Sequence, residues 1–153
     1  MMMSVEKDRY FDQYRVLSNR IAFHTEQLCR MRRELDALSC RWGENISSHK
    51  QDAPYIRQIE RIQDTEEKLK EENELQSRLQ EEMEMLIGTL SSEKWRYILM
   101  YRYLEGLSFP QIGDLLGVTE VTARRQRNRA LDFIVLPEEH ISFFLKNDSD
   151  DRK

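Results

Sequence analysis

The sequence has little of what sheets, tight turns and crosslinked folds require. Its 153 residues include five glycines, three prolines and two cysteines. So few turn-forming residues, beside 34% charged residues, are typical of long helices with large surfaces, and they argue against a sheet protein or a disordered chain. The two cysteines, Cys29 and Cys40, lie within a helical pattern without a disulfide framework, which predicts a reducing cytoplasmic compartment.

Other absences narrow the class of protein. No apolar run approaches the ~20 residues that a membrane-spanning helix needs, so we expect no membrane partner and no secretory signal. The sequence contains no glycine-rich phosphate loop, no carboxylate pair placed by strands and no nucleophile beside a base, so we expect neither an enzyme nor a cofactor. No metal is expected either, because His24, Cys29, Cys40 and His49 do not have the spacing of zinc ligands.

The net charge of −4 hides an uneven distribution along the chain. Residues 55–90 contain 5 basic and 10 acidic groups, whereas residues 91–134 contain 7 basic and 5 acidic groups. The acidic residues between Glu60 and Glu84 are interpreted as a solvated helix face. The concentrated positive charge consists of four arginines close together in the sequence, Arg124, Arg125, Arg127 and Arg129. Contact with nucleic acid is therefore expected in this segment.

A heptad pattern predicts a first long helix from about Val5 to Trp42. A second helix, over about residues 55–90, has a less regular stripe whose register should slip between Leu69 and Leu75. Two helices of similar length, joined by a linker over residues 43–54, predict a coiled-coil hairpin, although each helix could pair instead with a copy of itself. Either arrangement would support a homo-oligomer. In the first helix the heptad positions are Tyr14, Leu17, Ile21, His24, Leu28, Met31, Leu35 and Leu38.

Residues 91–136 carry the turn chemistry of a helix-turn-helix domain. Ser91 and Ser92 can cap a helix that ends at Gly106, and a capping box at Ser108 begins a short helix over about Phe109 to Leu116. Gly117 then turns the chain, and Thr119 caps a longer helix that reaches Phe133 or Ile134. We expect this last helix to bury only a thin stripe, made of Ala123, Ala130, Phe133 and Ile134, with Leu131 at its flank.

The polar faces of this last helix fit the major groove of DNA. A groove about 12 Å wide admits one helix, in which arginine matches guanine, and asparagine or glutamine matches adenine. The alternative is that the arginines only solvate the helix or pair with the acidic residues 60–84. The predicted DNA-binding residues are Glu120, Val121, Thr122, Arg124, Arg125, Arg127, Asn128 and Arg129.

The segment from Trp95 to Ile134 resembles region 4 of the sigma-70 family. The resemblance lies in RYLEGLSF at 102–109, IGDLLGVT at 112–119 and RAL at 129–131. It implies a small helical unit that reads promoter DNA in the major groove and can touch RNA polymerase. It also implies base contacts from the first residues of the last helix, with Arg127 and Arg129 nearer the phosphates. The sequence departs from the family pattern at Ala123 and at Gln126 or Arg127.

The rest of the chain lacks the aromatic-rich region with which a sigma factor melts DNA. A coiled-coil half followed by a region 4-like motif is similar to small phage or prophage activators of the RinA and ArpU type. This resemblance implies a late-gene transcriptional activator in the cytoplasm of a bacterial host, associated with the nucleoid. The alternatives are a packaging protein similar to a small terminase subunit and an adaptor that binds RNA polymerase.

The sequence as a whole thus predicts an all-α protein with three parts. Residues 1–90 should form the coiled-coil hairpin and residues 91–136 the DNA-binding domain. Residues 137–153 should form a short amphipathic segment, Ile141 to Leu145, and a frayed tail. In this segment, Phe143 and Phe144 are expected to pack on the helix-turn-helix of the same chain, and the alternative is that they meet a partner.

Overall fold

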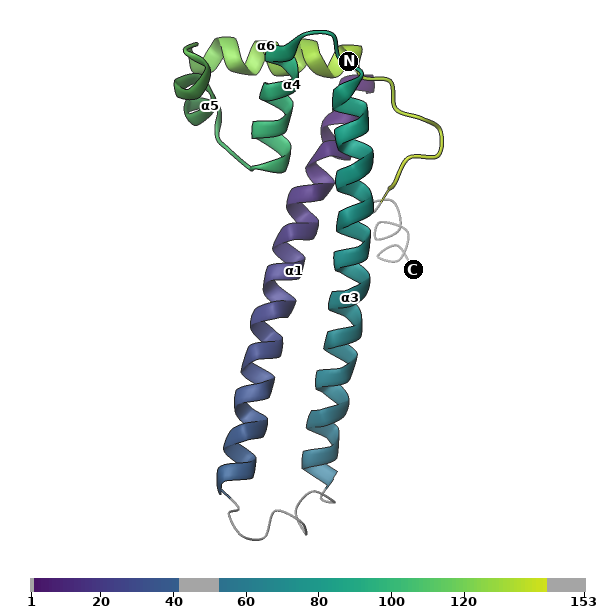
Figure 1. The fold of residues 1–153 in the computed structure, drawn as a ribbon, viewed down its shortest axis with the longest axis vertical. Helices are drawn as coiled ribbons and strands as arrows, with labels where there is room; N and C mark the ends of the chain where they lie inside the picture. The colour runs from purple at the N-terminus through teal and green to yellow at the C-terminus, as the bar shows by residue number, and fades with distance from the viewer. Residues whose placement is uncertain (1, 42–52, 143–153) are drawn as a thin grey trace. The chain divides into compact units, whose positions relative to one another are not determined.

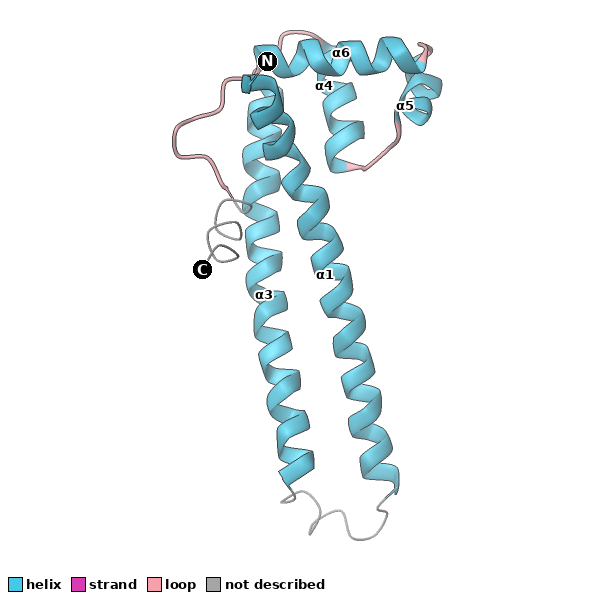
Figure 2. Ribbon diagram, turned by 180° about the vertical axis from the view of Figure 1, so that it is seen from behind, coloured by secondary structure: helices cyan, strands magenta, loops and turns pink. Residues whose placement is uncertain are grey.

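The computed structural model describes residues 2–41 and 53–142, and all of its regular elements are helical (Figure 2). The described residues contain no strand, as the scarcity of glycine and proline predicts. Most of the predicted linker and the residues Phe143 and Phe144 lie outside the described part of the chain. The elements are α1 (Met2–Arg41), α3 (Ala53–Gly88), α4 (Glu93–Leu99), the π-helical turn η2 (Met100–Leu104), α5 (Phe109–Leu116) and α6 (Glu120–Phe133).

The chain divides into two compact units at other boundaries than the predicted ones. One unit combines Met1–Leu17 with Gln76–Lys153, and the other is Ser18–Leu75. The start of the first long helix therefore packs with the C-terminal half of the chain, instead of belonging to a separate hairpin that ends at residue 90.

Within Ser18–Leu75 the chain forms an antiparallel hairpin, and Figure 1 shows α1 and α3 side by side. His24 contacts Glu72, whereas Arg32, further along α1, contacts Glu66, earlier in α3. The two helices therefore run in opposite directions and pair within one chain. Their core contains Leu28, Ile62 and Leu69, with Ile21, Met31 and Leu35 packed against it.

The register of α3 does not slip between Leu69 and Leu75, so that prediction is wrong. Polar residues occupy positions of the seam, which continues at spacings of three and four. Gln58 donates a hydrogen bond to the Met31 carbonyl (3.0 Å), and Glu72 lies 2.5 Å from His24 Nδ1. An apolar pattern alone misses such residues. The seam residues of α3 in this unit are Gln58, Ile62, Thr65, Leu69 and Glu72, and the same spacing reaches Leu79, Met83, Leu86 and Leu90.

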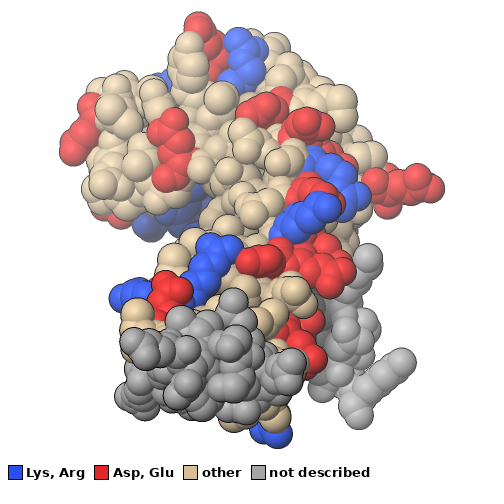
Figure 3. All heavy atoms as spheres, turned by 60° about the horizontal axis from the view of Figure 1, so that its bottom comes forward, with Lys and Arg blue, Asp and Glu red and all other residues tan. Residues whose placement is uncertain are grey.

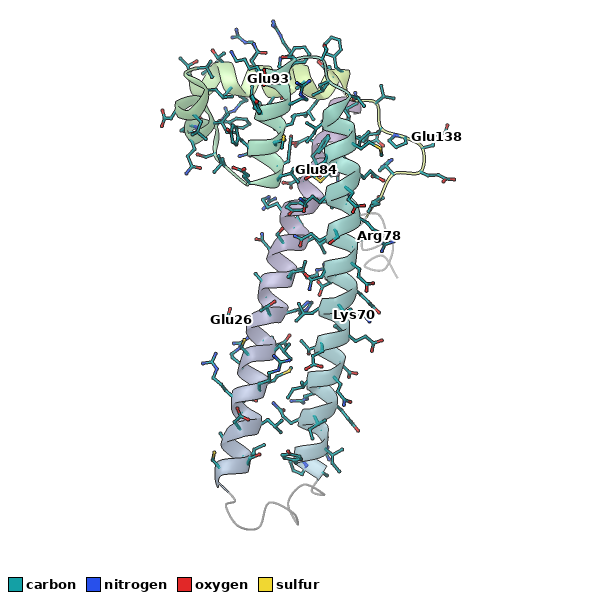
Figure 4. All side chains as sticks on the ribbon, viewed as in Figure 1. Glu26, Lys70, Arg78, Glu84, Glu93 and Glu138 are labelled. Carbon is teal, nitrogen blue, oxygen red and sulfur yellow. The ribbon has the colours of Figure 1, made fainter. Side chains whose placement is uncertain are left out.

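The acidic stretch of α3 is largely a solvated face, as predicted, with two exceptions. Glu72 belongs to the seam, and Glu82 accepts hydrogen bonds from the Tyr10 hydroxyl and from the backbone N–H of Ile141. On the face seen in Figure 3, basic and acidic side chains are interspersed. The exposed Glu26 projects from α1 on the side away from α3 (Figure 4).

The other unit is built around bulky side chains from the beginning of α1. Phe11 and Leu17 are fully buried, and the ring of Phe11 stacks on that of Tyr103 with a centroid distance of 5.2 Å. Gln13, also buried, donates a hydrogen bond to the Ile141 carbonyl, which fixes the chain after α6. Apolar residues at the end of α3 and just after it complete this core: Leu79, Met83, Leu86, Ile87 and Leu90.

Three further observations concern the described residues alone. None of their helices is both long enough and apolar enough to span a membrane. They contain no group of three His, Cys, Asp or Glu side chains that could hold a metal ion. Cys29 and Cys40 are exposed free thiols.

Candidate nucleic-acid interface

Three short helical elements form a scaffold for the candidate site. Helix α4 begins at the predicted cap, where the Ser92 hydroxyl accepts a hydrogen bond from the backbone N–H of Trp95. The helix continues into η2, and both α4 and α5 pack against α6. The core between them contains Ile98, Phe109, Ile112 and Ala123, with Tyr101, Leu107, Leu116 and Val118 packed against it.

Local sequence signals set the turn between α5 and α6. The capping box is present, because the Ser108 and Gln111 side chains each accept a hydrogen bond from the other residue's backbone N–H. Gly117 ends α5 with a φ of 68°, a left-handed conformation that glycine adopts without strain. At Gly113, a Cβ would lie 2.6 Å from the Val118 carbonyl oxygen, so only glycine allows the turn to pass this closely.

Thr119 is the N-cap of helix α6, and its side chain accepts a hydrogen bond from the Thr122 backbone N–H. Ala123, Ala130 and Ile134 are fully buried, as predicted. The prediction for Phe133 is wrong, because its side chain is 65% exposed and lies against the Trp95 ring, whereas Leu131 is buried. The buried stripe follows the helical period from residue 123 through 130, 131 and 134, and this period carries position 133 out of the core.

The opposite face of α6 carries most of the predicted DNA-binding residues. Val121, Arg125 and Asn128 are exposed at spacings of four and three, which places them on one helical face. Arg124 and Arg129 are also exposed and flank this face. Glu120, in the first turn, forms an exposed i,i+4 ion pair with Arg124 (3.1 Å), and Thr122 is half-buried beside the N-cap.

Arg127 differs from the other predicted DNA-binding residues because most of its contacts are with the scaffold, although its Nε also donates a hydrogen bond to Asn128 Oδ1 at 2.8 Å. Its side chain is only 16% exposed, and its guanidinium donates hydrogen bonds to the Asp8 carboxylate (3.2 Å) and the Tyr103 hydroxyl (3.3 Å). It also lies over the Phe109 ring, at 5.1 Å from the centroid. Arg127 therefore faces the scaffold. The sequence showed four arginines on one helix but did not show that an acid 119 residues away would turn one of them inward.

The same contacts affect Tyr103. Its hydroxyl donates a hydrogen bond to Asp8 at 2.5 Å, within a largely buried site. Burial, followed by this hydrogen bond, raises the pKa of Tyr103 above its ordinary value, and the charge of Arg127 partly offsets the rise. Tyr103 therefore stays neutral at physiological pH and can act as a hydrogen-bond donor.

The departure from the family pattern at Gln126 also has a structural explanation. The indole N–H of Trp95 donates a hydrogen bond to Gln126 Oε1 at 2.6 Å. A polar side chain is suitable at this half-buried position because a buried indole N–H needs an acceptor. Gln126 thus contacts α4 at the place where an apolar residue would make only van der Waals contact.

Two helices joined by a tight turn, with the second presenting an exposed basic face, define a helix-turn-helix unit. Residues 80–134 match the family model of sigma-70 region 4. This C-terminal part of the chain is therefore a sigma-70 region 4 domain, of the helix-turn-helix DNA-binding type, and the match begins inside α3, before the expected Trp95. No curated protein and no solved structure matches the chain.

Proposed function

We propose that this protein is a sequence-specific regulator of transcription that places α6 in the major groove of double-stranded DNA. The observation that carries the proposal is the exposed face of α6 within a sigma-70 region 4 domain. A helix with this many exposed basic and amide side chains provides both phosphate contacts, which position the protein, and base contacts, which give specificity.

The residues of this exposed face have different proposed roles, according to their positions at its centre or its edges. Arg125 and Asn128 lie near its centre, where a guanidinium fork suits guanine and a side-chain amide suits adenine. Val121 is 64% exposed between polar neighbours and fits the methyl group of thymine.

The remaining exposed residues lie at the edges of the face. Arg124 and Arg129 are placed to meet phosphates, and Glu120 and Thr122 lie at the end of the helix that enters the groove first. Arg127 is not among the proposed DNA contacts, because its guanidinium forms an ion pair with Asp8.

More specifically, we propose that the protein is a phage or prophage late-gene activator that acts in the bacterial cytoplasm. Its support is the order of the parts along the chain, in which a long helical hairpin precedes the segment that matches region 4. The hairpin leaves helix faces available for a second copy, which would make the DNA-binding unit a homo-oligomer. RNA polymerase is the further partner that a region 4 domain at a promoter would meet.

The test is selection of bound fragments from a random duplex pool, at physiological salt, with the full-length protein. One enriched motif is expected. Arg125→Ala should then weaken binding to that motif by ~1–3 kcal/mol and relax the preference at one base pair. Arg78→Ala is the matched control, because Arg78 is exposed on α3, outside the proposed interface (Figure 4).

The opposite result would be a folded protein, by circular dichroism, that enriches no motif. That outcome would refute sequence-specific regulation and favour the polymerase-binding adaptor. A ring of eight or more subunits in a mass measurement would favour the packaging protein.

A further inference from the structure

We propose that Asp8 and Lys7, near the beginning of α1, are positioning residues for the recognition helix α6. The inference rests on the proposed function, because it concerns how the DNA-reading face of α6 is aimed. Asp8 accepts a hydrogen bond from Arg127 at 3.2 Å, and Lys7 donates one to the carbonyl of Asp132 at 3.3 Å. These contacts span 119 and 125 residues of sequence, within a single compact unit.

The contact at Asp8 joins three elements at one point. The carboxylate of Asp8, on α1, accepts hydrogen bonds from the Tyr103 hydroxyl on η2 and from the Arg127 guanidinium on α6. Arg127 also donates to the Tyr103 hydroxyl, so each of the three groups contacts the other two. A charge-assisted network of this kind has a defined geometry, and it restrains rotation of α6 about its own axis.

The contact at Lys7 holds the C-terminal end of α6, whereas Asp8 contacts its middle. Asp132 lies in the last turn of α6, where backbone carbonyls lack helical partners and a positive charge is favourable. Arg127 and Asp132 are five residues apart, or about 7.5 Å along the axis at ~1.5 Å per residue. A helix held at two such points is restrained in tilt as well as in rotation. Neighbouring residues of α1 thus fix the direction of the face that bears Arg125.

The burial of Arg127 decides between positioning and competition for DNA. An acid near a DNA-binding helix could instead compete with phosphate for an arginine. Competition would require Arg127 to be presented to the DNA, but its side chain is 16% exposed and stacked over Phe109, on the scaffold side of α6. The two mechanisms predict opposite changes in DNA affinity when the charge of Asp8 is removed. Removing the charge of Asp8 weakens DNA binding if Asp8 positions α6, and strengthens it if Asp8 competes with phosphate.

The experiment compares Asp8→Asn with Asp12→Asn in the full-length protein. Asp12 is the matched control, because it lies one turn further along α1 and its carboxylate pairs with Arg15 on the same helix. The readouts are affinity for the duplex selected from the random pool, its salt dependence, and amide hydrogen exchange of α6 without DNA. Tyr103→Phe, which removes one member of the network and keeps the ring, serves if Asp8→Asn does not fold.

For Asp8→Asn we expect about tenfold weaker binding to the selected duplex and faster exchange in α6. The slope of log K against log salt should stay unchanged, since no phosphate contact is lost; loss of one contact would reduce it by ~1. Asp12→Asn should bind within about twofold of wild type. Lys7→Gln should accelerate exchange mainly in the last turn of α6, because it removes only the contact to the Asp132 carbonyl.

Three results would overturn the inference. They are tighter binding by Asp8→Asn, equal binding by both variants, and unchanged exchange in α6. In each of these cases the wild-type protein still selects a duplex, so the proposed function stands. A wild-type protein that selects no duplex refutes the proposed function itself, and with it the role of Asp8 in DNA recognition.

Discussion

Replacing Gly113 by alanine tests how the turn between α5 and α6 is built. The added Cβ would lie 2.6 Å from the Val118 carbonyl oxygen, whereas ordinary contacts begin near 3.4 Å. About 0.8 Å of movement is therefore required, and the atom in the way is backbone, which cannot turn aside as a flexible side chain can. The next atoms are the Thr119 carbonyl carbon, at 3.5 Å, and the Glu120 nitrogen, at 3.6 Å. The start of α6 must move with the turn.

The loss of unfolding free energy caused by Gly113→Ala follows from two opposing effects. Overpacking in a tight site costs ~1–3 kcal/mol, and contact with backbone places Gly113→Ala in the upper part of that range. Alanine in place of glycine inside a helix recovers up to ~1 kcal/mol. The net loss of unfolding free energy should be about 1–2 kcal/mol. For a protein of this length, such a loss corresponds to a fall in Tm of about 2–8 °C.

Gly88→Ala is the matched control. Gly88 is the last residue of α3, and a Cβ there would meet nothing within 4 Å. This variant should be neutral or up to ~1 kcal/mol more stable. Urea and thermal unfolding of both variants measure the difference. If Gly113→Ala proves as stable as Gly88→Ala, the close approach of the turn does not constrain this position and the reasoning is refuted.

Two further predictions concern a tyrosine and a helix cap. Burial and a hydrogen bond to Glu82 raise the pKa of Tyr10 above its ordinary 10.0, so above pH 10 the unfolded chain loses this proton first and stability falls. Tyr10→Phe should reduce that fall by about 1.4 kcal/mol per pH unit in urea unfolding, and an unchanged slope would contradict the assignment. Thr119→Ala should cost ~1 kcal/mol by removing the N-cap of α6, whereas Thr25→Ala, at an exposed site within α1, should cost less; equal losses would argue against the cap.

Much of the DNA-binding unit could be predicted because its signals are local. The capping box at Ser108, the left-handed Gly117 and the N-cap Thr119 each act within a few residues, and α5 begins and ends where they place it. The hairpin was predictable from heptad spacing for a similar reason, since the period of a helix fixes which residues share a face. The identity of the seam was harder to predict, because Thr65 and Glu72 are polar.

What the sequence could not show depends on contacts between distant segments. Leu115 is an apolar residue of α5 but is 58% exposed, because the buried side of this helix is formed by Phe109, Ile112 and Gly113. The arginines of α6 have the same local chemistry, yet Arg127 turns inward and Arg125 remains exposed. Nothing near Asp8 in the sequence indicates that it contacts α6.

The sequence by itself determined the helices, their caps, the turn at Gly117 and the charge of α6, because hydrogen bonding and steric limits within a few residues decide these features. Tertiary structure alone decided which arginine is withdrawn from the exposed face and which residues of α1 hold it. Those choices depend on the burial of Phe11 and Tyr103, which brings Asp8 within hydrogen-bonding distance of Arg127. A local sequence pattern does not predict this contact, because two charged side chains from distant segments interact only when packing has placed both in one compact unit.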